Sequence, residues 1–490
     1  SYNINITNLE YIQQYYYNYG DSIKYVQGTI TDTLLDTNPD FKPIYQFIIK
    51  SDLIKIALNR PSNDRSFQLY NTCMAYKVEQ CYDTAYFSLE NKIDSIFFTC
   101  DTTFNGKINK STSGIYWGSY GTGAKPIIVY SGSDPLYDRN TFYFTGSNLF
   151  IENLNVTYPS QSPDRHIEAY VTIGIKIEFG DNNTIQYCDF SLIGTGVFVN
   201  DGSNNNYIYQ CSFTDMRTIR NDPGADNDYG ANGCLWGNSN NNTVSHCFFD
   251  SCWAYSQDYG VDGGACESYG ACSNNKIIYC YINYSNGVME IGSGTAGTAA
   301  DNMVAYCKII NCSELTYTSA SGGFPVQCKN MQYYNNVIID TAGVFGFGAC
   351  FNYAGSETSD TVFNLKNNIF FLKGGIDVVA NSDTLKTLHQ NNSYSVSSGS
   401  STNYHLVPGE INVSIPATFV NIATYDFHLK STATSKGAGQ TITGSAWTPI
   451  DLDGRSIGVP PNNGVYGSIG ANTVIFPANV NGVNYGWYRN

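Results

Sequence analysis

Three acidic residues near the middle of the chain have types and spacing suited to acid–base chemistry. Glu267 ends the sequence Gly-Ala-Cys-Glu and Glu290 ends Gly-Val-Met-Glu, so each follows a glycine by three residues. Asp262 stands just upstream, in Gly-Val-Asp-Gly-Gly. Glycoside hydrolysis uses two carboxyl groups, one as the proton donor and the other as nucleophile or base. Because neighbouring like charges separate their pKa values, one carboxyl can stay protonated beside an ionised partner. The three acids are therefore the predicted catalytic residues.

An internal repeat indicates how the chain would bring these acids together. An Asn, then four residues, then a Cys or Asn followed by apolar residues, recurs seven times. The cysteines of this phrase lie 23, 36, 33 and 27 residues apart, which is typical of a solenoid with loops of varying length. The pairs are Asn148/Asn153, Asn183/Cys188, Asn206/Cys211, Asn242/Cys247, Asn275/Cys280, Asn302/Cys307 and Asn330/Asn335.

The repeating units predict short strands. They contain β-branched and aromatic runs punctuated by Asn and Gly, and they lack the long amphipathic runs that a helical solenoid needs. The sequence therefore predicts an all-β protein that folds as a parallel β-helix. In such a stack, equivalent residues recur about 4.8 Å apart. The repeated Cys would form a buried ladder, and the repeated Asn would hydrogen-bond from coil to coil.

The same stacking predicts where the acids lie. Strand alternation places Cys266 and Met289 inward and Glu267 and Glu290 on the outer face, at matching positions of neighbouring coils. Matching positions are about 5 Å apart, which fits a retaining glycosidase. A pair formed by Asp262 and Glu290 would be wider and would fit an inverting one. The spacing leaves both pairs open. It also leaves open a calcium site or an exposed row of acids without catalysis.

Two long insertions flank these acids, and they contain candidate residues for substrate binding. The insertions begin at Asp215 and Asp250 and belong to successive coils, so they would emerge side by side and could wall a cleft. Arg217 and Arg220 could hold a uronate, or could pair with Asp215 and Asp222. The aromatic residues that could stack on sugar rings, or could instead cover the solenoid, are Tyr229, Trp236, Trp253, Tyr259 and Tyr269.

The rest of the chain predicts two caps on one domain spanning residues 1–490. Residues 1–90 would form an N-terminal cap and elaboration, residues 91–400 the coils, and residues 401–490 an irregular C-terminal cap. At the N-terminus Leu9, Ile12, Tyr16 and Tyr19 share one helical face, which predicts a helix that covers the open end of the solenoid. A strand is expected to follow at residues 22–26.

Composition narrows the class of protein. The net charge is -15 with only 26 Lys and Arg, which argues against nucleic acid as a partner. No apolar run is long enough to span a membrane. The chain has 15 cysteines, and three pairs are close enough for local bridges: Cys73/Cys81, Cys266/Cys272 and Cys307/Cys312. Sequons and a start at Ser1 favour a secreted glycoprotein whose signal peptide has been removed. A monomer is expected.

Several stretches resemble a known superfamily. ITNLEYIQQYYYNYGDSIKYVQGTI, DSIFFTCDTTFNGKI, SYGTGAKPII and the closing IDLDGRSIGVPPNNGVYGSIGA resemble secreted right-handed parallel β-helix proteins of the pectate-lyase-like superfamily. The pair GVDGGACES and NGVMEIGSG resembles the catalytic coils of β-helix glycoside hydrolases, which include β-xylosidases and fucosidases. The resemblance implies a right-handed solenoid and carboxylate roles for Asp262, Glu267 and Glu290.

The leading prediction is an extracellular glycoside hydrolase that acts on a polysaccharide or oligosaccharide without a cofactor. The alternative is a calcium-assisted polysaccharide lyase, with Arg217, Arg220 or Lys276 as base and the metal ligands Asp222, Asp226 and Asp228. A third interpretation is a glycan-binding or surface protein without catalysis. The polygalacturonase pattern of adjacent Asp-Asp with a later Gly-His-Gly is missing from the sequence, so that branch is excluded.

Overall fold

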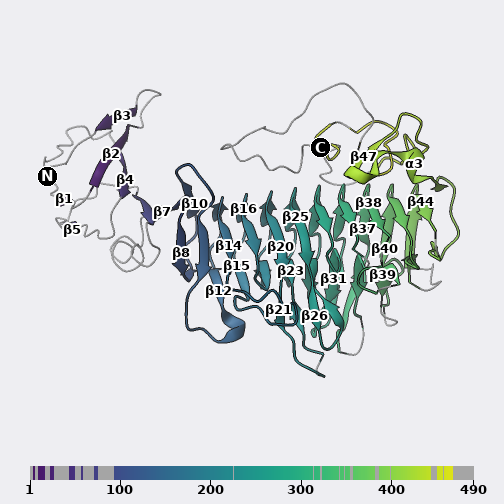
Figure 1. The fold of residues 1–490 in the computed structure, drawn as a ribbon, viewed down its shortest axis with the longest axis horizontal. Coiled ribbons are helices and arrows are strands. Elements are labelled where there is room, and N and C mark those ends of the chain that lie inside the picture. Colours follow the sequence, from purple (N-terminus) through teal and green to yellow (C-terminus); the bar gives the residue numbers. More distant parts are fainter. Residues whose placement is uncertain are drawn as a thin grey trace.

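Three long stacks of strands dominate the computed structural model of the chain (Figure 1). The structure describes residues 95–466 except 225, 313, 321–322, 342, 347, 354–356, 381–385, 398, 443–449 and 456, together with the bounds of the strands before residue 95. The chain visits the three sheets in turn, for example through β24 (Thr243–Ser245), β25 (Phe248–Cys252) and β28 (Gly264–Tyr269). Each of these three strands pairs in parallel with its equivalents in the coils before and after it. The predicted parallel β-helix is confirmed.

The first sheet contains 15 strands. In spatial order they are β3 (Ile23–Val26), β2 (Leu9–Tyr16), β4 (Pro43–Ile49), β6 (Asn71–Ala75), β7 (Ile93–Thr99), β10 (Tyr116–Tyr120), β13 (Phe150–Glu152), β16 (Thr184–Gln186), β19 (Tyr207–Tyr209), β24, β29 (Lys276–Ile278), β33 (Met303–Ala305), β37 (Met331–Tyr334), β40 (Phe363–Lys366) and β43 (Thr387–Gln390).

The second and third sheets contain 12 and 10 strands. The second consists of β8 (Thr103–Gly106), β11 (Ile127–Tyr130), β14 (Asn155–Thr157), β17 (Asp189–Ser191), β20 (Ser212–Met216), β25, β30 (Tyr281–Asn283), β34 (Lys308–Ile310), β38 (Val337–Asp340), β41 (Ile369–Leu372), β44 (Ser393–Val396) and β45 (Ile411–Asn412). The third consists of β9 (Ile108–Lys110), β12 (Asn140–Phe144), β15 (Ile173–Glu178), β18 (Thr195–Asn200), β23 (Asn232–Gly237), β28, β31 (Met289–Gly292), β35 (Thr316–Thr318), β39 (Ala349–Tyr353) and β42 (Asp377–Val379).

Short elements complete the described structure. Two antiparallel hairpins interrupt the coils before the third sheet, β21 (Thr218–Arg220) with β22 (Tyr229–Gly230) and β26 (Ala254–Ser256) with β27 (Gly260–Asp262). The others are the pairs β1 (Ile4–Asn5)/β5 (Ala57–Leu58), β32 (Gly297–Ala300)/β36 (Val326–Lys329) and β46 (Phe419–Asn421)/β47 (Asp426–Leu429), and the helices η2 (Leu136–Asp138), α3 (Ile415–Thr418) and η4 (Ile422–Thr424). None of the helices in the described part is long and apolar enough to cross a membrane.

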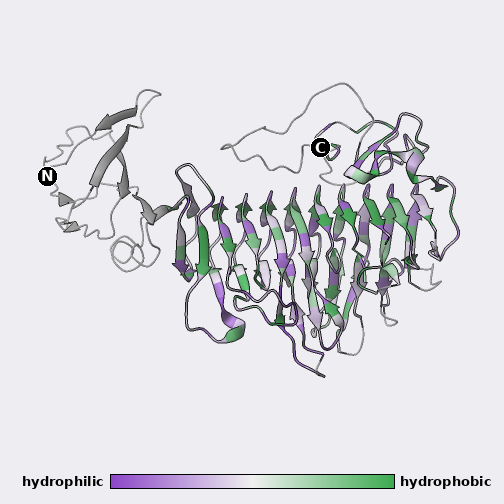
Figure 2. Cartoon of the chain, viewed as in Figure 1, coloured by the Kyte–Doolittle hydropathy of each residue, from purple (hydrophilic) through white to green (hydrophobic). Residues whose placement is uncertain are grey.

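Ladders of like side chains form the core. Buried and partly exposed residues alternate along strands such as β11, so hydrophobic and hydrophilic colours are interspersed along the stack (Figure 2). Phe190, Phe213 and Phe249 stack inside at centroid distances of 5.0 and 4.8 Å. The predicted cysteine ladder is buried, and the Sγ atoms of Cys247 and Cys280 each accept the backbone N–H of the preceding rung at 3.4 Å.

The predicted asparagine ladder is also confirmed. The Oδ1 atom of Asn242 accepts the backbone N–H and the Nδ2 of Asn206, and the Oδ1 of Asn275 does the same for Asn242. The first and last predicted pairs, Asn148/Asn153 and Asn330/Asn335, lie one residue before the true rungs of the ladder. Leu149 occupies the rung before Asn183, and Asn336 the rung after Cys307. Asn148, Asn153, Asn330 and Asn335 instead take left-handed turn conformations, which Asn tolerates.

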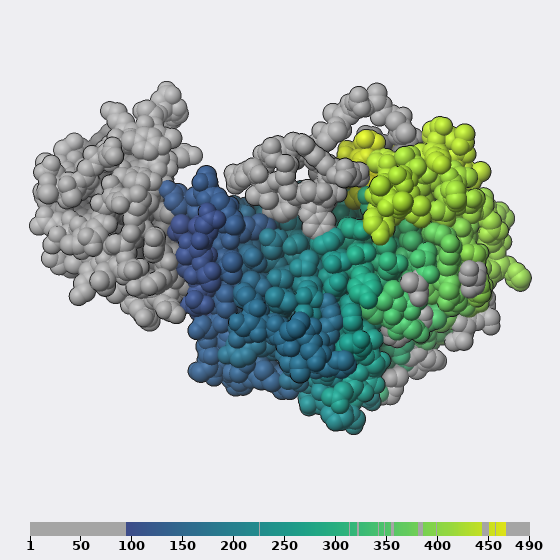
Figure 3. All heavy atoms as spheres, in the orientation of Figure 1, coloured from purple at the N-terminus to yellow at the C-terminus, as the bar shows by residue number. Residues whose placement is uncertain are grey.

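The two ends of the chain differ from each other. The predicted N-terminal capping helix is not shown, because residues Leu9–Tyr16 form β2, paired with β3 and β4. Three Tyr and one Ile lie there, and these residue types favour a strand. The strand expected at residues 22–26 is confirmed as β3. At the other end, residues 415–466 pack apolar side chains such as Phe419, Phe427 and Val465 against Tyr306 and Ile369 of the solenoid (Figures 1 and 3).

Candidate active site

The two glutamates predicted to act together occupy equivalent positions on the third sheet. Strand β28 pairs with β31 so that Glu267 lies opposite Glu290 and Cys266 lies opposite Met289. Cys266 and Met289 are buried in the core, whereas both glutamates are partly exposed. The expected register and alternation are therefore confirmed for these four residues. Equivalent residues of paired strands lie about 5 Å apart, so the two carboxyl groups leave the sheet as neighbours.

Two further acids lie close to this pair. Asp262 is the last residue of β27, in the hairpin that precedes β28, and Glu314 lies just before β35. Burial raises the pKa of both Glu267 and Glu290; the charge of Glu290 adds to the rise at Glu267, and the charges of Asp262 and Glu314 add to it at Glu290. Burial and the charge of Glu267 raise the pKa of Asp262, and burial raises that of Glu314 to about 7. These four residues form the acid cluster.

Hydrogen bonds distinguish the members of the acid cluster. Asn232 donates its Nδ2–H to Glu267 Oε2 at 2.6 Å, which favours the ionised form of Glu267. Asn352 donates to Glu314 Oε1 at 3.2 Å, and the backbone N–H of Gly263 donates to Asp262 Oδ1 at 2.7 Å. Within the described residues, the side chain of Glu290 has no hydrogen-bond donor of this kind. Glu290 is therefore the member best placed to hold a proton near neutral pH.

The arginines of the neighbouring insertion are bound to acids of their own. Arg217 is buried and donates two hydrogen bonds to Asp215, at 2.9 and 3.0 Å. Arg220 donates to Asp222 at 2.6 Å. Pairing with Asp215 and Asp222, one of the two predicted alternatives, is thus confirmed for both arginines. Lys276, the other proposed lyase base, begins β29 on the first sheet rather than the third.

The aromatic residues divide into several groups. Trp236 is fully buried in the core, so its predicted role in stacking on sugar is wrong. Trp236 lies opposite Ser268, and Leu235 lies opposite Glu267. Tyr259 and Tyr269 are exposed, and Tyr259 lies in the turn of the hairpin that ends at Asp262. Burial raises the pKa of Tyr259, and the charges of Asp226 and Asp262 add to the rise.

Tyr229 and Trp253 lie in different surroundings. Tyr229 is exposed. Burial and Tyr137 raise the pKa of Tyr229 and Arg220 lowers it, whereas the residues of the acid cluster do not contribute. The guanidinium of Arg165 lies 4.3 Å from the centre of the Trp253 ring. Arg165 also donates to the backbone oxygens of Met216 and Ser251, at 3.2 Å each, to that of Trp253 and to the carboxylate of Asp215. Trp253 is thus held by a strap from another coil.

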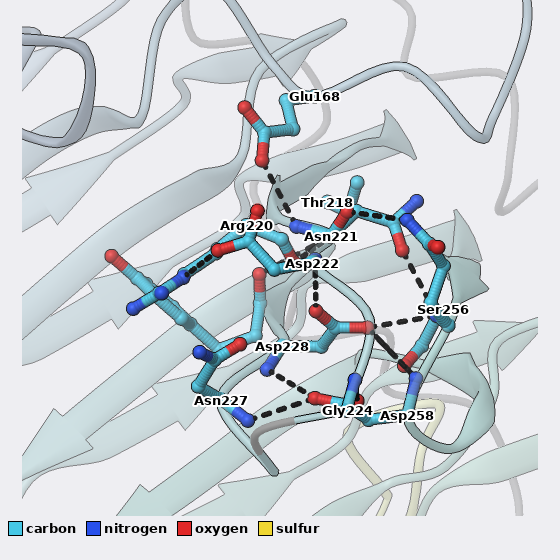
Figure 4. Close-up of polar contacts among 12 residues, drawn as sticks. Glu168, Thr218, Arg220, Asn221, Asp222, Gly224, Asn227, Asp228, Ser256 and Asp258 are labelled. Carbon is cyan, nitrogen blue, oxygen red and sulfur yellow. Dashed lines mark hydrogen bonds and ion pairs between the residues drawn. The ribbon is translucent and has the colours of Figure 1, made fainter.

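Two of the three proposed calcium ligands are engaged by hydrogen-bond donors. Asp222 pairs with Arg220, and Asp228 is buried and accepts several N–H groups (Figure 4). Asp226 is exposed. Within the described part of the chain, no three His, Cys, Asp or Glu side chains are grouped so that they could hold a metal ion. The prediction that Asp222, Asp226 and Asp228 form one calcium site is therefore wrong.

The proposed local disulfides do not form where the structure describes them. Cys266, Cys272, Cys307 and Cys312 are free and buried. The Sγ of Cys272 donates to the backbone oxygen of Trp236 at 3.3 Å. Cys73 and Cys81, the third predicted pair, lie outside the residues whose side chains are described.

Three polar residues of the site were not predicted from sequence: Asn232, Glu314 and Asn352. Asn232 lies opposite Gly264, so aligning Asn-Gly-Cys at 232–234 with Gly-Ala-Cys at 264–266 would have found it. Asn352 lies opposite Tyr317, which in turn follows Glu290 along the same row. Glu314 has no such signal, because it lies in a connecting segment outside the repeated phrase.

Comparison with known proteins finds likeness in structure only. No protein-family model matches the chain. No curated protein matches its sequence. An alginate lyase from Paenibacillus sp. str. FPU-7 is similar in structure, with 14% identity, a TM-score of 0.41 and coverage of 70% of this chain and 99% of the lyase. An endo-xylogalacturonan hydrolase from Aspergillus tubingensis has 9% identity, a TM-score of 0.39 and coverage of 70% and 91%.

A third similar structure is the catalytic domain of a GH87 alpha-1,3-glucanase in complex with nigerose. It has 11% identity, a TM-score of 0.39 and coverage of 73% of this chain and 70% of the glucanase domain. These values carry no information about which reaction this chain performs.

Proposed function

We propose that the protein is a glycoside hydrolase that cleaves an uncharged glycan at Glu267 and Glu290. The observation that carries this proposal is the pairing of these two glutamates in register within an acid cluster whose pKa values are all raised. Two carboxyl groups at this separation, one favoured as the anion and one as the acid, are what retaining glycoside hydrolysis requires.

The chemistry follows from the different surroundings of the two groups. Glu290 donates its proton to the glycosidic oxygen as the bond from C1 to that oxygen breaks, and the carboxylate of Glu267 attacks C1. Water then attacks C1 of the glycosyl-enzyme and gives a proton to Glu290, which releases Glu267. Burial and the charges of Asp262 and Glu314 keep the pKa of Glu290 high, so that it is protonated at the start. The exposed rings of Tyr259 and Tyr269 would contact the sugars.

The charge of the site supports a neutral substrate rather than a uronate polymer. Four carboxyl groups would repel a uronate unless a cation lay among them. The arginines nearest in sequence are bound to Asp215 and Asp222, and lyase chemistry needs a base and a cation that neutralises the uronate. A polymeric glycan is found outside the cell, so we also propose that the protein is secreted. We propose in addition that it acts as a monomer.

The test is a panel of neutral and uronate polysaccharides, with reducing ends and ultraviolet absorbance measured in parallel. Hydrolysis of a neutral glycan yields reducing ends without absorbance. Glu267→Gln and Glu290→Gln should each lower kcat by about 10²–10⁴-fold. The exposed Asp360→Asn is the control and should leave kcat unchanged. Unsaturated, absorbing products from a uronate polymer would overturn the proposal.

The stereochemical outcome tests the assignment of the pair. Nuclear magnetic resonance of the first product should show retention of the anomeric configuration if Glu267 is the nucleophile. Net inversion would instead assign the reaction to Asp262 with Glu290 and a water between them.

A further inference from the structure

Two acidic side chains outside the acid cluster join the loops that carry the site. Asp228 lies at the end of the β21–β22 connection, and Asp258 lies in the turn between β26 and β27. Each carboxylate accepts hydrogen bonds from the other residue's loop (Figure 4). Asp228, Asp258 and the groups that donate to them are called the carboxylate clasp.

Asp228 supplies one half of the clasp. Its Oδ1 accepts the backbone N–H of Asp222 at 2.6 Å. Its Oδ2 accepts the hydroxyl of Ser256 at 2.7 Å and the backbone N–H groups of Gln257 and Asp258 at 2.8 and 3.1 Å. The side chain is buried, so these donors provide the stabilisation that water or a cation would otherwise give.

Asp258 supplies the other half. Its Oδ1 accepts the backbone N–H of Gly224 at 2.7 Å, and its Oδ2 accepts the N–H of Asn227 at 2.9 Å. The backbone N–H of Asp228 is a longer donor to Oδ2, at 3.4 Å. Because each loop both donates and accepts, neither can move without breaking bonds made by the other.

The clasp lies directly beside residues of the site. Asp258 precedes Tyr259 in the turn of the hairpin that ends at Asp262, and Asp262 pairs with Ala254 across that hairpin. Asp228 directly precedes strand β22, and β22 is followed within two residues by Asn232, the donor to Glu267. Burial and Glu267 raise the pKa of Asp262, and the charge of Asp228 raises it further, which agrees with the closeness of the two groups.

We propose that Asp228 is a positioning residue, and that the carboxylate clasp holds Tyr259 and Asp262 over the Glu267–Glu290 pair. This inference rests on the proposed function. A loop that is fixed before substrate binds keeps reacting groups aligned, and misplacement by about 1 Å can cost about 100-fold in rate. The clasp provides this rigidity with protein groups alone, in place of a bound metal ion.

The test compares Asp228→Asn with Asp222→Asn. In Asp228→Asn the new side-chain amide N–H points at N–H and O–H groups that donated to the carboxylate. Two donors cannot bond to each other, so the clasp opens. In Asp222→Asn only the contact to Arg220 is lost, because the clasp uses the backbone of residue 222. Asp228→Asn should lower kcat about 10- to 100-fold with a smaller change in KM. The control should stay within about twofold of wild type, since it loses only an exposed ion pair.

Two measurements do not depend on turnover. Hydrogen exchange at the amides of residues 257 and 258 should be at least about tenfold faster in Asp228→Asn than in Asp222→Asn, because both amides donate to the Asp228 carboxylate. A carboxyl-carbon titration should show a lower pKa for Asp262 in Asp228→Asn. Asp258→Asn should speed exchange at the amides of residues 224 and 227, which donate to Asp258, and the double variant should add little, since the two acids act as a unit.

The outcomes separate this inference from the proposed function. A wild-type chain that cleaves no neutral glycan sinks the hydrolase proposal, while exchange and titration still decide whether the clasp orders the loops and Asp262. Faster exchange with unchanged kcat would show that the clasp is structural only and would overturn the positioning role. Wild-type loss of activity in chelator, restored by calcium chloride alone, would overturn the metal-free clasp.

Discussion

Glu267 and Glu290 are the same residue type in the same row of one sheet, yet their surroundings separate them. Asn232 stabilises the anion of Glu267, whereas Asp262 and Glu314 stabilise the protonated form of Glu290. Division of roles between two equal carboxyl groups therefore depends on neighbours contributed by other coils. These neighbours can be changed one at a time.

Replacement of Asn232 should change the pH dependence more than the fold. Asn232→Ala removes the donor to Glu267, so the pKa of Glu267 should rise and the acidic limb of kcat/KM should move to higher pH. The matched control is Asn200→Ala, which removes the same kind of amide contact, to Glu178 at 3.1 Å. It should leave the profile where it is. An acidic limb that does not move in Asn232→Ala would mean that Glu267 is not the group that must ionise.

The acid cluster should make the protein less stable as pH rises. Folding raises the pKa of Asp262, Glu267 and Glu290, so the native state binds protons more tightly than the unfolded chain. This stabilisation is complete below the unfolded pKa of about 4 and is lost as pH rises through the native values, at about 1.4 kcal/mol per pH unit for each group. Glu290→Gln should therefore raise Tm near pH 8 more than near pH 4. Asp360→Asn should change Tm equally little at both. A Tm difference that is independent of pH would contradict the raised pKa of Glu290.

At the scale of elements, the ladders explain which features could be predicted. The in-phase cysteines and asparagines fix the distance between coils, so the register of Glu267 with Glu290 follows from sequence. Trp236 could not be placed, since the number of residues in an insertion does not determine where the next strand begins. Glu314 and the carboxylate clasp depend on loop conformations, and no repeated phrase encodes these. The helix predicted from the spacing of apolar residues at 9–19 is wrong, because residues Leu9–Tyr16 form a strand and aromatic residues at helical spacing also suit a strand.

The asparagine ladder should be sensitive to loss of a single rung. Asn242 accepts from Asn206 and donates to the backbone oxygen of Ser203 and to Asn275, all in the interior. Asn242→Ala leaves these groups without partners and should lower the free energy of unfolding by about 2–4 kcal/mol. The neighbouring Asn241 is exposed with a φ of 59°, so Asn241→Gly is the control and should be nearly neutral. Urea denaturation of both variants gives the comparison. Equal losses would mean that the ladder contributes little beyond ordinary turns.

At the scale of the whole molecule, the coils and the C-terminal region form a continuous packed body. Residues of the C-terminal region cover the corner between the first and second sheets, and Tyr279 donates to the backbone oxygen of Ile450 at 3.3 Å. The hairpins β21–β22 and β26–β27 lie at the opposite edge of the stack (Figure 1). The proposed site is therefore built on loops that the described part of the C-terminal region does not cover, and variation in these loops leaves the core unchanged.

The strap made by Arg165 extends beyond adjacent coils. Arg165 belongs to the connection between β14 and β15, and it binds backbone oxygens at the ends of β20 and β25. In a simple repeat array each unit contacts only its neighbours, so on heating the units unfold one after another from the ends and the melting curve broadens. A tie across several turns makes them melt together. Scanning calorimetry of Arg165→Ala should show a wider transition, with a van't Hoff enthalpy that falls further below the calorimetric one than in wild type. Lys176→Ala breaks an ion pair to Glu178 within one strand and ring contacts to Tyr143 and Phe198 on the two adjacent strands, so it should keep the wild-type ratio.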